Sequence, residues 1–162
     1  MLGVRTSKNS VSYDGIISII KSQANPNAVA TMEKFGINPT DAYGVSVPTL
    51  RAIAKKVEKR NHTIAQEPWN SGIHEARLLV SMIDDPDLVT EKQMEEWVKD
   101  FNSWDICDQC CSNLFDKTKY AYKKATEWSN MMDEEFVKRA GFVLMDTLAV
   151  HDAVSNNLIV HQ

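Results

Sequence analysis

Apolar residues recur every three or four positions along most of this chain, which is the spacing of amphipathic helices. Asn25-Pro26 reads as a helix cap with a first-turn proline, Val47-Pro48 opens a further helix, and Thr90 to Gln93 reads as a capping box. The pattern predicts helices over about residues 12–24, 28–35, 47–57, 73–83, 90–98, 104–114, 120–128 and 133–150, with at best a short helix at 63–69. Residues 155–162 carry no helical pattern of their own.

The predicted helices come in pairs joined by short polar turns, and hardly any segment alternates as a strand does. The pairs repeat at roughly 35–45 residues, which is the spacing of HEAT-like repeats. We therefore predict an all-α fold, an α–α superhelix (solenoid) of HEAT-like helical repeats. It forms one domain over residues 1–162, with residues 1–11 disordered. A compact helical bundle is the alternative.

The composition is typical of a single globular domain and not of a membrane or secreted protein. The 162 residues are 43% hydrophobic and 25% charged, which fits one globular domain, and no apolar run approaches the roughly 20 residues of a membrane span. The N-terminus lacks the apolar segment of a secretion signal. With a net charge of −4, binding to nucleic acid requires a local basic stripe. All three cysteines lie between Cys107 and Cys111, which predicts reduced thiols in a cytoplasmic protein.

The stretch from Asn102 to Phe115, NSWDICDQCCSNLF, departs from the plain helical pattern. Trp104 and Asp108 are four residues apart and lie on one face of the predicted helix. An aromatic surface beside a carboxylate suits a cationic or electron-poor planar ligand. Periodicity alone favours the alternative, a partly buried tryptophan at a helix entrance with an aspartate that stabilises the helix N-terminus.

Four segments resemble the DNA alkylation repair proteins, the AlkD-type alkylpurine DNA glycosylases. They are YGVSVPTLRAIAK (43–55), EARLLVSMI (75–83), FNSWDICDQCCSNLF (101–115) and EEFVKRAGFVLM (134–145). The resemblance implies a HEAT-like solenoid whose concave face binds duplex DNA. It also implies hydrolysis of the N-glycosidic bond of cationic N3-methyladenine and N7-methylguanine, without a metal or cofactor.

Three residues match the active site of that family. Trp104 matches the tryptophan that lies against the damaged nucleotide, Asp108 the catalytic aspartate, and Arg139 the arginine of the catalytic site. Family members continue into further helices that supply a second tryptophan, which this chain lacks. We therefore expect a C-terminally truncated form that is a poor glycosylase. Its last helix exposes apolar residues over more than one face, so we also expect self-association or partial disorder at that end.

The chemistry of these side chains fits the implied reaction. A methylated purine is cationic and already a good leaving group, so catalysis needs only a stabilised oxocarbenium-like sugar and a positioned water. The Asp108 carboxylate can supply both, and Trp104 can hold the cationic nucleotide by contacts worth about 0.5–2 kcal/mol. Arg139 can clamp a phosphate by its planar fork. The alternative for Arg139 is an exposed helix residue paired with Glu135.

Basic residues that could follow the DNA backbone lie on three segments, and solvated helix faces are the alternative for each of them. The predicted DNA-binding residues are Arg51, Lys55, Lys117, Lys123, Lys124 and Lys138, with Lys59 and Lys119 beside them. The runner-up function is a non-catalytic HEAT-like module that binds DNA or protein. Asp108 discriminates between the two, because catalysis requires it open to the groove and a scaffold would bury or cap it.

Other chemistries have less support. Cys107, Cys110 and Cys111 do not make a zinc site with four ligands, so we expect buried thiols that pack the helix. The four histidines are scattered and no serine or cysteine motif surrounds them, which disfavours nucleophilic catalysis. Trp69, Trp97 and Trp128 are expected to pack in the core.

Overall fold

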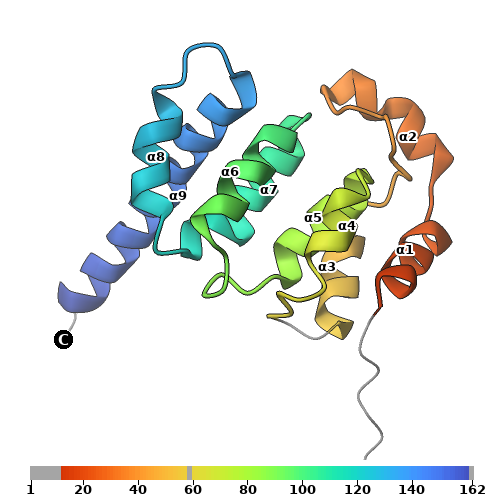
Figure 1. The fold of residues 1–162 in the computed structure, drawn as a ribbon, viewed down its shortest axis with the longest axis horizontal. Coiled ribbons are helices and arrows are strands. Elements are labelled where there is room, and N and C mark those ends of the chain that lie inside the picture. The colour runs from red at the N-terminus through yellow and green to blue at the C-terminus, as the bar shows by residue number, and fades with distance from the viewer. Residues whose placement is uncertain (1–11, 58–59, 161–162) are drawn as a thin grey trace, which may run out of the picture.

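The computed structural model describes residues 12–57 and 60–160, and all regular elements in these ranges are helical (Figure 1). The expectation that residues 1–11 are disordered, and the basic residue Lys59, lie outside the described ranges. The elements are α1 (Tyr13–Ser22), α2 (Pro26–Met32), the 3-10 turn η1 (Glu33–Phe35), α3 (Val47–Lys56), α4 (Gln66–Asn70), α5 (His74–Ile83), α6 (Glu91–Asp100), α7 (Trp104–Asn113), the 3-10 turn η2 (Phe115–Lys117), α8 (Ala121–Ser129) and α9 (Glu135–Val160).

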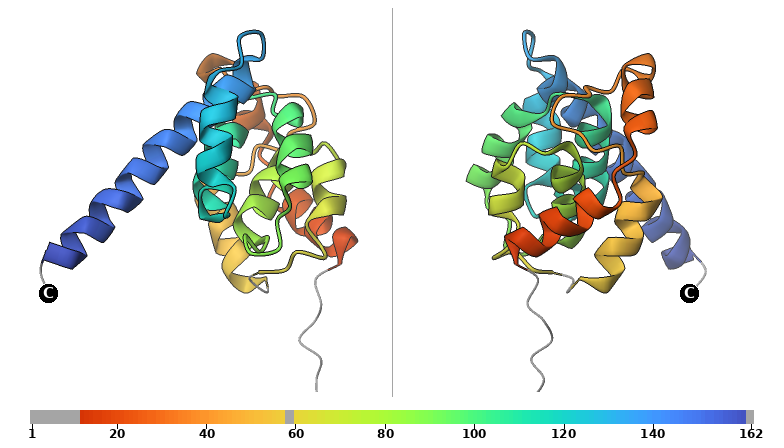
Figure 2. Two further views of the ribbon diagram at one scale, coloured as in Figure 1. Left: turned by 60° about the vertical axis from the view of Figure 1, so that its left-hand side comes forward. Right: turned by 90° about the vertical axis from the view of Figure 1, so that its right-hand side faces the viewer.

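The helices stack in two layers. In one layer α3 packs against α5, α5 against α7, and α7 against α9. Helices α4, α6 and α8 lie on the other side of this row, with α4 against α5 and α8 against α9 (Figures 1 and 2). Each helix therefore contacts its neighbours along the row, as in a solenoid, and the compact bundle is not formed.

Local capping explains where several helices begin. The side chains of Asn25 and Thr90 accept hydrogen bonds from backbone N–H groups three residues later, as the sequence predicts, and Ser46 caps α3 in the same way. The Gln93 side chain, however, donates to Asp84 Oδ2 at 2.8 Å, so only the threonine half of the predicted capping box is seen.

A row of aromatic side chains connects the helices of the second layer, α4, α6 and α8, to one another. The rings of Trp69 and Trp97 are stacked, with centroids 4.0 Å apart and planes within 4°. Phe115 continues the row, and the centroid of its ring lies 5.9 Å from that of Trp128. All three tryptophans are buried, which confirms their predicted role in the core.

Helix α9 is longer than the sequence pattern predicts, because it continues from Val150 to Val160. The polar residues Ser155, Asn156 and Asn157 each cost a helix only about 0.7 kcal/mol or less, and no glycine or proline interrupts the segment. The C-terminal part of α9 projects away from the other helices (Figure 2). Val150 and Val154 are exposed along it. No helix in the described ranges is both long enough and apolar enough to cross a membrane.

Candidate functional site

The start of α7 is anchored by the buried carboxyl group of Asp105. Ser103 Oγ donates to Asp105 Oδ1 at 2.6 Å, and His74 Nε2 lies 2.7 Å from Asp105 Oδ2. Burial opposes the charge of Asp105, but the hydrogen bond and charge of His74 outweigh burial and lower the pKa of Asp105 below its ordinary value. Because His74 opens α5, this contact fixes the first turn of α7 against its neighbour.

Trp104 is the first residue of α7 and is 38% exposed. Its indole Nε1–H donates to the backbone carbonyl of Phe35 at 2.9 Å. Phe35 ends η1, and Gly36 follows with φ +70°, a left-handed conformation that glycine adopts without a steric penalty. The hydrogen bond orients the indole, and much of the ring stays open to solvent.

Asp108 and Arg139 form a bidentate ion pair between α7 and α9. Arg139 Nε and Nη2 donate to Asp108 Oδ1 and Oδ2, each at 2.8 Å, and this bonding raises the pKa of Arg139 above its ordinary value. The side chains are 31% and 43% exposed, and the guanidinium carbon lies 6.0 Å from the centroid of the Trp104 ring. Arg139 thus pairs across two helices with Asp108, and not with Glu135 on its own helix.

A stripe of partly or fully exposed side chains runs along α7, which we call the α7 stripe. It consists of Trp104, Asp108, Gln109, Ser112 and Asn113. These positions follow the i, i+4, i+5 spacing of one helix face. Arg139 meets this stripe from α9, so the structure brings together all three residues that the sequence predicted for the active site.

The cysteines face away from the stripe and pack α7 against α9. The thiols of Cys107 and Cys111 donate to the backbone carbonyls of Phe136 and Ala140 at 3.6 and 3.8 Å. Burial raises the pKa of the Cys110 and Cys111 thiols well above the ordinary value. The prediction of buried thiols is confirmed, and the described residues contain no cluster of side chains suited to a metal ion.

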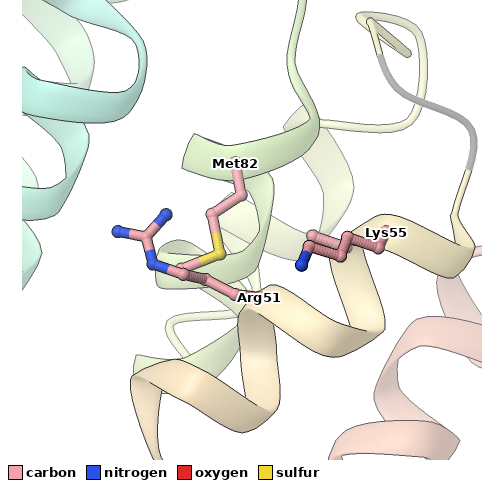
Figure 3. Close-up of a pocket in the computed structure, with 4 residues that line it drawn as sticks. Arg51, Lys55 and Met82 are labelled. Carbon is pink, nitrogen blue, oxygen red and sulfur yellow. The ribbon is translucent and has the colours of Figure 1, made fainter.

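Arg51 reaches the α7 stripe from α3. Its Nη2 donates to Gln109 Oε1 at 2.9 Å and to Asn113 Oδ1 at 3.4 Å. Lys55 lies one turn further along α3, and the two cations flank Met82 (Figure 3). A small pocket of about 160 Å³ lies here, lined by Arg51, Ala54, Lys55 and Met82.

The structure places Lys124 in the interior, although the sequence predicted a contact with DNA. The residue is only 2% exposed, and its ammonium lies 2.8, 2.6 and 2.8 Å from carboxylate oxygens of Glu91, Glu95 and Glu127. Burial opposes this charge, but the hydrogen bonds to the three carboxylates raise the pKa of Lys124. Lys124 therefore joins α6 to α8 and is not available to a phosphate.

The other predicted DNA-binding residues differ in how far their charge is already neutralised. Lys123 pairs with Glu91 at 2.7 Å, and Lys117 with Asp116 at 3.1 Å. Lys138 is exposed on α9. These three lysines remain candidates for contacts with DNA.

Gln109 and Asn113 were not among the site residues predicted from the sequence. Gln109 and Asn113 are four residues apart and Gln109 follows Asp108, so their spacing alone places them on the helix face that Asp108 occupies. Their partner, Arg51, lies about sixty residues earlier in the chain, and only the fold brings it to α7.

Two comparisons with known proteins found a match. A family model described as "DNA alkylation repair enzyme" matches residues 16–159. A solved structure described as "A new family of proteins related to the HEAT-like repeat DNA glycosylases with affinity for branched DNA structures" superposes with a TM-score of 0.75 at 19% identity. The match covers 85% of this chain and 57% of that one, and no curated protein matches.

The structural similarity confirms the predicted α–α superhelix of HEAT-like repeats. The family model spans most of the sequence, from the first described helix to the end of α9. The chain therefore belongs to the DNA alkylation repair enzyme family.

Proposed function

We propose that this chain is a DNA glycosylase that hydrolyses the N-glycosidic bond of cationic alkylated purines, N3-methyladenine and N7-methylguanine, in duplex DNA. The observation that carries the proposal is the Asp108–Arg139 ion pair beside the exposed ring of Trp104. A carboxylate, a guanidinium and an aromatic face in one surface patch match the needs of a cationic nucleotide linked to a phosphate backbone.

In the proposed reaction each side chain has one task. The face of Trp104 holds the cationic deoxynucleotide, and Asp108 stabilises positive charge on the sugar as the neutral base departs. A DNA phosphate competes for the fork of Arg139, which frees one oxygen of Asp108 to orient the attacking water. The cationic base needs no protonation to leave, so the reaction requires no general acid, metal or cofactor.

One observation favours a second candidate, a non-catalytic module that binds DNA. Both oxygens of Asp108 are engaged by Arg139, which partly caps the carboxylate. The similar solved structure is described as having affinity for branched DNA. In this alternative Arg139 and Asp108 shape a surface for DNA without cleaving the glycosidic bond.

The test is release of free N7-methylguanine from duplex DNA by the wild-type protein and by Asp108→Asn. The proposal expects base release from the wild type and loss of most of it in the variant. Duplex binding and the circular dichroism of the variant should persist, because asparagine keeps the shape of the side chain. Binding without base release by the wild type would favour the non-catalytic module, whereas wild-type activity in Asp108→Asn would refute the catalytic role of Asp108.

Arg139 offers a second check on the same patch. Arg139→Ala should weaken duplex binding more than Lys117→Ala or Lys123→Ala, because a bidentate fork binds a phosphate more strongly than a mobile ammonium. Equal and small losses in the three variants would show that Arg139 is only a surface residue.

A further inference from the structure

Arg51 donates only to neutral acceptors, as the half-buried Arg77 does to the backbone carbonyls of Trp69 and Asp100, whereas two other arginines of the described residues pair with carboxylates. Arg139 pairs with Asp108, and Arg60 with Asp87. Within residues 12–57 and 60–160, Arg51 contacts only the neutral side-chain amides of Gln109 and Asn113. Its position is therefore fixed while its positive charge stays uncompensated.

A chain of hydrogen bonds fixes the direction of both amides. Ser81 Oγ donates its proton to the Leu78 carbonyl at 2.6 Å, so its lone pairs are left to accept from Asn113 Nδ2 at 3.2 Å. Asn113 Nδ2 also donates to Gln109 Oε1 at 3.0 Å. Both amide oxygens then face Arg51, which has five N–H donors and uses them on neutral acceptors only.

Lys55 adds a second cation next to this guanidinium. It is exposed, lies four residues from Arg51 on the same face of α3, and lines the same pocket. The apolar residues Ala54 and Met82 also line the pocket, and Figure 3 shows Met82 beside the two cations. A pocket of about 160 Å³ with two cations at its rim has the size and charge for one phosphate group.

The pocket lies beside the proposed active site. Gln109 adjoins Asp108 in the α7 stripe, and Arg139 meets that stripe from the other neighbouring helix. The charge of Arg139 is engaged by Asp108 in this structure, whereas the charges of Arg51 and Lys55 are not engaged by any described carboxylate. A strand that lies along the stripe would meet Arg51 and Lys55 without first breaking an ion pair.

We infer that Arg51 and Lys55 form a subsite for one backbone phosphate of duplex DNA, with Gln109 and Asn113 as positioning residues. This inference rests on the proposed function only in taking DNA as the ligand. Because the subsite touches no base, it contributes equally to damaged and undamaged DNA. The subsite contributes to the affinity for DNA and to the position of the DNA backbone along the protein. The rate of base release from bound DNA does not depend on it.

The experiment measures the binding of undamaged duplex DNA by fluorescence anisotropy over a series of salt concentrations. The slope of log K against log salt falls by about 0.9 for each phosphate that the protein no longer neutralises. Arg51→Ala should weaken binding about tenfold at low salt and reduce the slope by about 0.9. The Arg51→Ala/Lys55→Ala double variant should bind more weakly still, with no second reduction of the slope, because both cations hold one phosphate.

Lys92→Ala is the matched control, because Lys92 is exposed on α6 in the other layer. Its affinity and slope should equal those of the wild type. An unchanged slope in the double variant overturns the subsite, and so does a reduction of about 1.8, which would mean two separate phosphates. Failure of the wild-type protein to bind the duplex also overturns it.

Gln109→Glu tests the positioning role without removing either cation. A carboxylate at this position pairs with Arg51 and should reduce the slope as Arg51→Ala does, with the thermal unfolding midpoint retained. A wild-type slope in Gln109→Glu overturns the role of the amides. Slope reductions as expected without any base release from methylated DNA would sustain the subsite and refute the glycosylase.

Discussion

Helices α8 and α9 approach each other closely at Gly141, two residues after Arg139 on α9. A Cβ atom added there would lie 2.2 Å from the backbone nitrogen of Ser129, and 2.7 Å from both Ser129 Cα and the carbonyl carbon of Trp128. All three atoms belong to the backbone at the end of α8, so no flexible side chain can move aside. Gly141→Ala should therefore push α8 and α9 apart.

The magnitude follows from two opposing effects. Alanine stabilises a helix interior by about 1 kcal/mol relative to glycine. Ordinary contacts begin near 3.4 Å, so the helices must separate by roughly 1 Å at this point, and overpacking of this kind costs about 1–3 kcal/mol or more. Since only rigid backbone is available to yield, we place the cost at the upper end and expect a net loss of about 2 kcal/mol.

Urea unfolding followed by circular dichroism measures this loss as a lower midpoint at an unchanged slope. Asn157→Ala, an exposed position further along α9, is the control and should be neutral or slightly stabilising. Base release should fall in Gly141→Ala, because a shift of α9 changes the position of Arg139 relative to Asp108. A Gly141→Ala protein as stable as the wild type would refute the close approach of α8 and α9.

Four further outcomes are expected. Trp104→Ala should lower both affinity for methylated duplex DNA and the rate of base release, measured by anisotropy and single-turnover assays, with little change for undamaged DNA. Lys124→Ala should lower the free energy of unfolding by about 1–3 kcal/mol in urea titrations, because it removes the shared partner of three carboxylates. The hydrogen bonds from Lys123 and Lys124 lower the pKa of Glu91 from 4.5 to about 2. The ionised Glu91 carboxylate therefore stabilises the fold fully above pH 4.5, and this stabilisation is lost as the pH falls through 2. Glu91→Gln should flatten the dependence of the unfolding free energy on pH between these two values. We also propose self-association through the projecting part of α9, which Val154→Asp should reduce in sedimentation or light-scattering measurements of solution mass; a wild-type monomer at high concentration would contradict it.

Local signals were sufficient for most of the helices. Asn25, Ser46 and Thr90 cap helices by bonds to residues three positions away, and such bonds depend on the nearby sequence alone. The end of α9 was predicted ten residues too early, because the last residues show no helical pattern of their own, although the chain there has no strong helix breaker.

The candidate site depended on distant parts of the chain. The spacing of Trp104 and Asp108 predicted their shared face, but the Asp108–Arg139 pair joins residues 31 positions apart and needs the packing of α7 on α9. Lys124 was predicted at the surface, although it follows Ala121 at i+3 on the apolar face of its helix. Its burial depends on carboxylates that α6 presents from the other side of the core, which no local pattern reveals.

The distribution of the tryptophans gives the protein an optical probe of its own site. Trp69, Trp97 and Trp128 are buried, and the first two are stacked face to face, whereas Trp104 alone is open to solvent. Solvent relaxation shifts the emission of an exposed indole to longer wavelength, so detection on the long-wavelength side of the emission band favours Trp104 over the three buried tryptophans. DNA that covers this ring should shift or quench that emission and leave the near-ultraviolet ellipticity of the stacked pair unchanged. Occupancy of the site can thus be followed in unlabelled protein.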